Sequence, residues 1–132
     1  MAVLDLDRAK WQTFKTTNNL SKSSFFNKAD VGPNIDAFQK AVAEYRTAKS
    51  EKSLMKVFGK ATDLQKAFKK FLDIKEGKNE LTNDSRAKIE KWASQLDTVQ
   101  KTLAVTHEKF EAKLKQGDYD EMDKTLKECL PF

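Results

Sequence analysis

The chain has 132 residues, of which 39% are hydrophobic and 34% are charged, with a formal net charge of +5. This length is typical of one domain that buries its own core, and this composition excludes wholesale disorder. Only 4 glycines and 2 prolines occur, which favours long helices over many short strands and turns. We therefore expect an all-α protein, a four- to five-helix antiparallel bundle, with residues 1–132 forming a single helical domain.

The positive charge is concentrated in the middle of the chain. Residues 31–78 carry an excess of basic side chains, whereas residues 79–132 are mildly acidic. This distribution permits a polyanionic partner, and it equally permits the two parts to pack on each other.

Cysteine use and hydropathy indicate where the protein works. The single cysteine, Cys129, excludes an intramolecular disulfide, as is typical of a reducing compartment. The first residues lack the basic region followed by an apolar region that forms a signal peptide. No apolar run approaches the ~20 residues that a membrane-spanning helix needs. We expect a cytoplasmic protein, alone or in a particle assembled in the cytoplasm, without a membrane partner. The small size and high lysine content would also suit a phage accessory or virion protein.

The N-terminal part predicts a helix over 3–16 and a polar connector over 17–34. The connector is rich in Asn and Ser but contains the aromatic pair Phe25 and Phe26. These two side chains either plug the core or anchor a partner.

Two helices follow, over 34–48 and 51–75. The apolar stripe of the second is rotated by roughly 130° from that of the first, at 100° per residue. We expect a break across 47–53 with Ser50 or Ser53 as N-cap; one continuous helix with a drifting stripe is the alternative. Gly59, inside the second helix, predicts a close helix crossing.

The longest predicted helix covers about 83–116, with Thr82 as N-cap. Its apolar residues have nearly heptad spacing, and at 1.5 Å per residue the helix would be about 50 Å long. Any part of it without a partner helix in the molecule would form an oligomer interface, as in a coiled coil. A last helix over 119–129 follows, with Asp118 and Glu121 as a capping box.

No motif indicates catalysis, a metal or a cofactor. His107 is the only histidine, and we expect it at the edge of the core, bonded to a neighbour. The acidic run 118–123 lacks the spacing of an EF-hand, and helix capping explains it without a metal. We therefore predict a protein that is not an enzyme.

A row of lysines lies opposite the apolar face of the helix 51–75. The row consists of Lys52, Lys56, Lys60, Lys66 and Lys70. It could contact phosphates in a salt-dependent manner, accompany a membrane- or groove-binding apolar face, or simply solvate a core helix. The phenylalanines opposite are needed in the core, which disfavours the membrane interpretation.

The C-terminal tail supplies a second pair of partner-binding candidates, Leu130 and Phe132, which flank Pro131; packing back on the bundle is the alternative.

The sequence thus predicts a non-catalytic protein–protein interaction or assembly module, such as an adaptor, a regulator or a structural subunit. The alternative is a sequence-independent nucleic-acid-associated protein that uses the lysine row.

Overall fold

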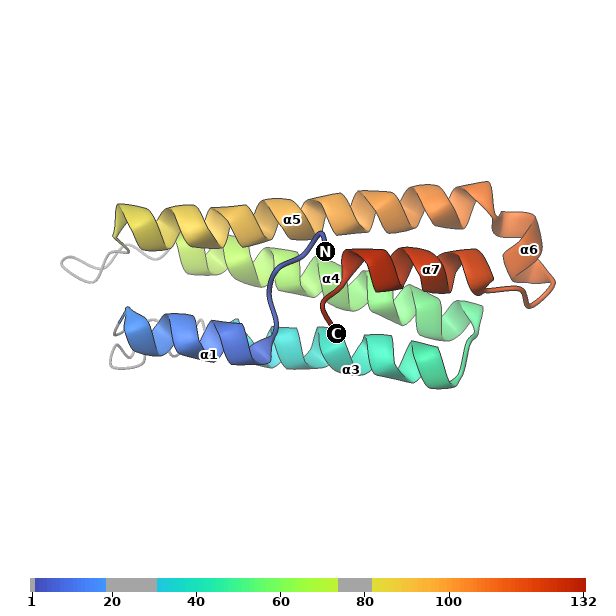
Figure 1. Ribbon diagram of the computed structural model, residues 1–132, viewed down its shortest axis with the longest axis horizontal. Helices are drawn as coiled ribbons and strands as arrows, with labels where there is room; N and C mark the ends of the chain where they lie inside the picture. The colour runs from blue at the N-terminus through green and yellow to red at the C-terminus, as the bar shows by residue number, and fades with distance from the viewer. Residues whose placement is uncertain (1, 19–30, 74–81) are drawn as a thin grey trace.

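The computed structural model describes residues 2–18, 31–73 and 82–132, which form six helices and no strand. This result confirms the all-α class. The helices are α1 (Arg8–Thr17), α3 (Gly32–Thr47), α4 (Glu51–Leu72), α5 (Asn83–Lys109), α6 (Glu111–Lys115) and α7 (Asp120–Cys129) (Figure 1). The helical bounds shorten the predicted connector, because α1 includes Thr17 and α3 already begins at Gly32.

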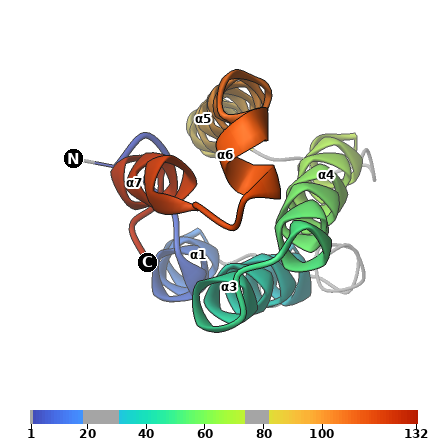
Figure 2. The same cartoon turned by 90° about the vertical axis from the view of Figure 1, so that its right-hand side faces the viewer.

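The three long helices α3, α4 and α5 lie side by side along the molecule (Figure 1, Figure 2). α4 packs against both α3 and α5. His107 of α5 contacts Glu51 at the start of α4, whereas Gln65, further along α4, donates to the carbonyl of Ala93. Residue numbers thus rise along α4 as they fall along α5, so these two helices are antiparallel.

The two ten-residue helices α1 and α7 lie on the remaining side of the bundle (Figure 2). α1 packs on α3 and α7 packs on α5. The two helices occupy different halves of the long axis, and the chain ends meet near its middle (Figure 1). There the Leu4 N–H donates to the carbonyl of Cys129 at 2.9 Å. The fourth position of the bundle is therefore a composite of both ends of the chain.

The first helix begins at Arg8, five residues later than predicted. Asp7 is its N-cap, and the Asp7 carboxylate accepts from the Lys10 N–H at 2.8 Å. The preceding residues are not helical, yet Leu4 and Leu6 are buried. The Trp92 indole N–H donates to the carbonyl of Asp5 at 2.9 Å and ties this segment to α5.

An aromatic cluster occupies one half of the core. The Trp11 ring contacts Phe14 of its own helix, Phe71 of α4 and Trp92 of α5, with ring centroids 5.4 to 6.1 Å apart. Phe68 of α4 joins it at 6.5 Å. Each aromatic ring removes a large apolar area from water, so this cluster is a major source of stability.

The break between α3 and α4 falls where the rotation of the apolar stripe predicted it. Ser50 is the N-cap of α4: its Oγ accepts from the Ser53 N–H, and the Ser53 Oγ accepts from the Ser50 N–H, both at 3.1 Å. This reciprocal pair is a capping box. One continuous helix, the alternative, is wrong.

The predicted long helix is also interrupted. Thr82 caps α5 as expected, but α5 ends at Lys109 and Phe110 leaves the helical conformation, with φ −109° and ψ 23°. The short α6 then turns away from the axis of α5 at the end of the bundle (Figure 2), and Leu114 is buried there. A straight helix would run past the start of α4 and leave Leu114 without packing.

The ends of two further helices differ from the prediction. α4 ends at Leu72 with Asp73 as C-cap, short of residue 75. α7 begins at Asp120, with Tyr119 as N-cap and no capping side chain. The Asp118 carboxylate instead accepts from the Asp120 N–H at 3.2 Å. The predicted capping box between Asp118 and Glu121 is therefore wrong, although Asp118 does satisfy one N–H of the first turn.

Candidate functional site

The lysine row lies on the side of α4 that faces away from the core. Lys52, Lys56, Lys66 and Lys70 are exposed, and Lys60 is half-buried. On the opposite side, six residues of α4 are buried: Leu54, Val57, Ala61, Leu64, Phe68 and Phe71. The helical periodicity thus sorts the charged and the apolar side chains as the sequence predicted.

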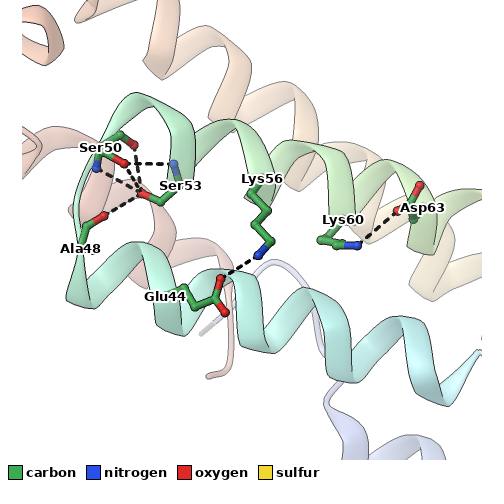
Figure 3. A network of polar contacts seen from close by, with 7 residues as sticks. All are labelled: Glu44, Ala48, Ser50, Ser53, Lys56, Lys60 and Asp63. Carbon is green, nitrogen blue, oxygen red and sulfur yellow. Dashed lines mark hydrogen bonds and ion pairs between the residues drawn. The ribbon is translucent and has the colours of Figure 1, made fainter.

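Two of the five lysines are neutralised within the chain (Figure 3). Lys56 Nζ lies 3.0 Å from Glu44 Oε2, and this hydrogen bond lowers the pKa of Glu44. Lys60 Nζ lies 4.0 Å from Asp63 Oδ2, one turn further along α4. Across the described ranges, the three remaining lysines make no ion pair. Most of the charge of the row is therefore uncompensated.

Lys40 of α3 belongs to the same surface and was missed by the sequence reasoning. It is exposed and lines a groove together with Lys52 and Lys56 of α4. Its position could not be found from the periodicity of α4 alone. The sequence feature that indicates Lys40 is its spacing of four residues from Glu44, which places both side chains on one face of α3.

A shallow groove follows the seam between α3 and α4. Its larger part, about 570 Å³, is lined by Ala43, Ala48, the hydroxyl residues near the turn, Glu44 and three lysines. A smaller depression of about 240 Å³ continues it along the seam, and both parts share Lys40, Glu44 and Lys56. We call this groove, together with Lys40 of α3 and the five lysines of the row on α4, the lysine surface: Lys40, Lys52, Lys56, Lys60, Lys66 and Lys70.

At Gly59 no helix of the described chain crosses α4, so the predicted crossing is not found within the molecule. The residue is exposed, and a Cβ built on it would meet no atom of the described chain within 4 Å. Met55, one turn earlier on α4, is 42% exposed. The outer face of α4 thus combines lysines with an open glycine and an exposed methionine.

The tail candidates contact the bundle. Leu130 is buried in the core, and the Phe132 ring is partly buried against Phe38, with ring centroids 5.8 Å apart. These contacts correspond to the alternative in which the tail packs back on the bundle. The other aromatic candidates, Phe25 and Phe26, lie outside the described residues.

His107 and Cys129 lie in different parts of the bundle. His107 Nε2 is 2.9 Å from Glu51 Oε1, and the imidazole packs edge-on against Phe58 at the end of α5. Its neighbour is therefore Glu51 of α4, which is distant in sequence. Cys129 is buried at the end of α7, and burial raises the pKa of its thiol. A raised pKa reduces the thiolate fraction on which nucleophilic chemistry depends.

In the part of the chain that the structure describes, no three His, Cys, Asp or Glu side chains come together in a way that would hold a metal ion. None of the described helices has the length and the apolar character needed to cross a membrane.

Comparison with known proteins gives no match: no family model, no curated protein and no solved structure resembles this chain significantly.

Proposed function

We propose that this protein is a non-catalytic interaction module that binds an acidic segment of another protein through the lysine surface. The observation that carries the proposal is the uncompensated charge of this surface. Residues 31–73 contain nine basic and five acidic side chains. Most lysines of the lysine surface make no ion pair within the described chain. Such a field attracts acidic partners and accelerates their association.

The groove favours a protein partner over a bare polyanion. Ala43 and Ala48 line it with their methyl groups, together with Lys40 and Lys52. A peptide segment buries apolar side chains in such a groove while its carboxylates meet the ammonium groups. A phosphate backbone would contact the ammonium groups and leave the methyl groups without a counterpart.

Nucleic-acid binding is the second candidate function, and the length of the lysine row supports it. Lys52 and Lys70 lie 18 residues apart on one helix, about 27 Å at 1.5 Å per residue. A row of that length spans several phosphates, and its affinity would fall steeply with salt concentration.

A pull-down from the native cell with and without nuclease, analysed by mass spectrometry, tests both functions. The bait is compared with a triple variant, Lys40→Glu, Lys52→Glu and Lys66→Glu. A matched control variant carries Lys91→Glu, Lys101→Glu and Lys124→Glu, which change the net charge equally at exposed positions elsewhere.

The proposal expects a defined protein that survives nuclease, is lost from the triple variant and is retained by the control. Partners that disappear with nuclease would support the nucleic-acid candidate instead. Equal capture by the two variants would overturn the role of the lysine surface.

A further inference from the structure

Gly59 lies at the centre of the outer face of α4, and no other part of the described molecule packs on it. A Cβ on Gly59 meets nothing within 4 Å, whereas one on Gly32 would collide with the Arg8 guanidinium. Gly117 has φ +83°, a left-handed conformation that favours glycine. Of these three glycines, only Gly59 has neither a steric nor a conformational need for glycine. A glycine inside a helix destabilises it relative to alanine, and no contact within the described molecule explains the glycine at this position.

The residues around Gly59 form a face suited to another helix. Lys52 and Lys66 lie seven residues before and after Gly59, two helical turns away on the same side of α4. Met55 and Asp63 lie one turn away in the two directions. Met55 is 42% exposed and supplies an apolar contact beside the open backbone.

We infer that α4 is crossed at Gly59 by an acidic amphipathic helix of the partner. The inference rests on the proposed function and specifies how the partner binds. Helix axes approach more closely where the side chains at the crossing are small. Without a Cβ at Gly59, a small or apolar residue of the partner reaches the backbone of α4 and packs on Met55. Its flanking carboxylates then meet Lys52 and Lys66.

Charge disfavours a second copy of this chain as the occupant by symmetric pairing of α4 with α4. Such pairing would bring Lys52, Lys66 and Lys70 of one copy against the same lysines of the other. Like charges placed together in an interface are repulsive. An acidic helix has the sign opposite to that of these lysines, and Asp63, the acidic side chain one turn from Gly59, is already paired with Lys60.

A synthetic peptide tests the inference without a purified partner. The probe is a 20-residue stapled helix with alanine and leucine on one side and glutamate on both flanks, labelled for fluorescence anisotropy. A second peptide with lysine in place of every glutamate is the charge control. The protein is compared with Gly59→Ala, with Gly59→Leu and with Ala104→Leu, which adds the same bulk at an exposed position of α5.

We expect the acidic peptide to bind and the basic peptide not to bind. Gly59→Leu is expected to weaken binding at least tenfold and Gly59→Ala by a smaller factor, while Ala104→Leu leaves the affinity unchanged. Thermal unfolding of Gly59→Ala is expected at a higher temperature than that of the wild type. Loss of affinity together with a gain of stability distinguishes a contact residue from a structural one.

Failure of the inference and failure of the proposed function differ in outcome. If the triple lysine variant loses the peptide but Gly59→Leu retains it within twofold, the crossing at Gly59 is wrong and the acidic-partner surface stands. If the acidic peptide does not bind the wild type, or binds it no better than the basic peptide, both are overturned. Preferential binding of a single-stranded oligonucleotide, unaffected by Gly59→Leu, would also reject both in favour of phosphate contact.

Discussion

Lys56 of α4 and Glu44 of α3 form an ion pair across the groove, with 3.0 Å between Nζ and Oε2. The hydrogen bond from Lys56 lowers the pKa of Glu44 from its ordinary value of 4.5. A lowered carboxyl pKa stabilises the fold above the ordinary value, and the stabilisation is lost as the pH falls below it. We predict that Glu44→Gln makes the stability of the protein less sensitive to acid between neutral pH and pH 3.

Chemical denaturation at several pH values measures this effect. Glu108→Gln, at an exposed position of α5, is the matched control and is expected to follow the wild type. An acid dependence of Glu44→Gln equal to that of the wild type would show that the ion pair is too well solvated to matter, as many surface pairs are.

The capping box at the start of α4 provides a second prediction. The Ser50 Oγ accepts from the Ser53 N–H and so satisfies one of the free donors of the helix N-terminus. Ser50→Ala is expected to lower the free energy of unfolding by about 1 kcal/mol, and Ser50→Asp, which preserves the cap, by much less. Urea unfolding followed by circular dichroism separates these outcomes. Equal losses in the two variants would contradict the role of the cap.

Two glycines are expected to respond in opposite directions to the same substitution. Gly59 is helical and has open space around its Cα, so Gly59→Ala is expected to stabilise the protein by up to about 1 kcal/mol. Gly117 has φ +83°, so Gly117→Ala is expected to destabilise it by about 1 kcal/mol. Thermal unfolding of both variants measures the two shifts. Shifts of the same sign would contradict this interpretation of the backbone.

Tyr45 predicts a pH effect on the alkaline side. Its ring is buried and its hydroxyl has no hydrogen bond of good geometry. Burial, and then the nearby Asp123 carboxylate, raise the pKa of Tyr45 above its ordinary value of 10.0. A raised pKa means that the stability is complete below pH 10 and declines as the pH rises, by up to about 1.4 kcal/mol per pH unit.

Tyr45→Phe is therefore expected to keep most of its stability at pH 8 and to become relatively more stable above pH 10. Urea unfolding of the variant and the wild type at pH 8 and pH 11 gives the comparison. A constant difference between the two proteins at both pH values would show that Tyr45 ionises as easily in the folded as in the unfolded chain.

The sequence was most informative where one local pattern dominates. The apolar stripe of α4, the rotation of that stripe before Ser50 and the cap at Thr82 all appear in the structure where periodicity and capping rules predicted them. Each of these features depends on residues within a few turns of one another. Local propensity and burial agree in these segments, so that the sequence pattern alone is sufficient.

The features that were missed depend on contacts between distant segments. The helix break at Phe110 depends on where α4 begins, and no glycine or proline at that position indicates it in the sequence. The exposure of Gly59 and the location of Lys40 beside α4 depend on which helices are neighbours. The extended start of the chain did have a local signal, because Leu4 and Leu6 alternate with Asp5 and Asp7 as in a strand-like segment.

The meeting of Leu4 and Cys129 has a consequence for synthesis of the protein in the cell. During translation, α1, α3, α4 and α5 emerge first, but the site that holds Leu4 and Asp5 between α5 and α7 is complete only when α7 has left the ribosome. Until then the nascent chain exposes Leu4 and the apolar side of α5 that α7 later covers. Contacts this remote in sequence slow folding and prolong the exposure of apolar surface. Truncated products that end before α7 should therefore be substrates for chaperones and proteases.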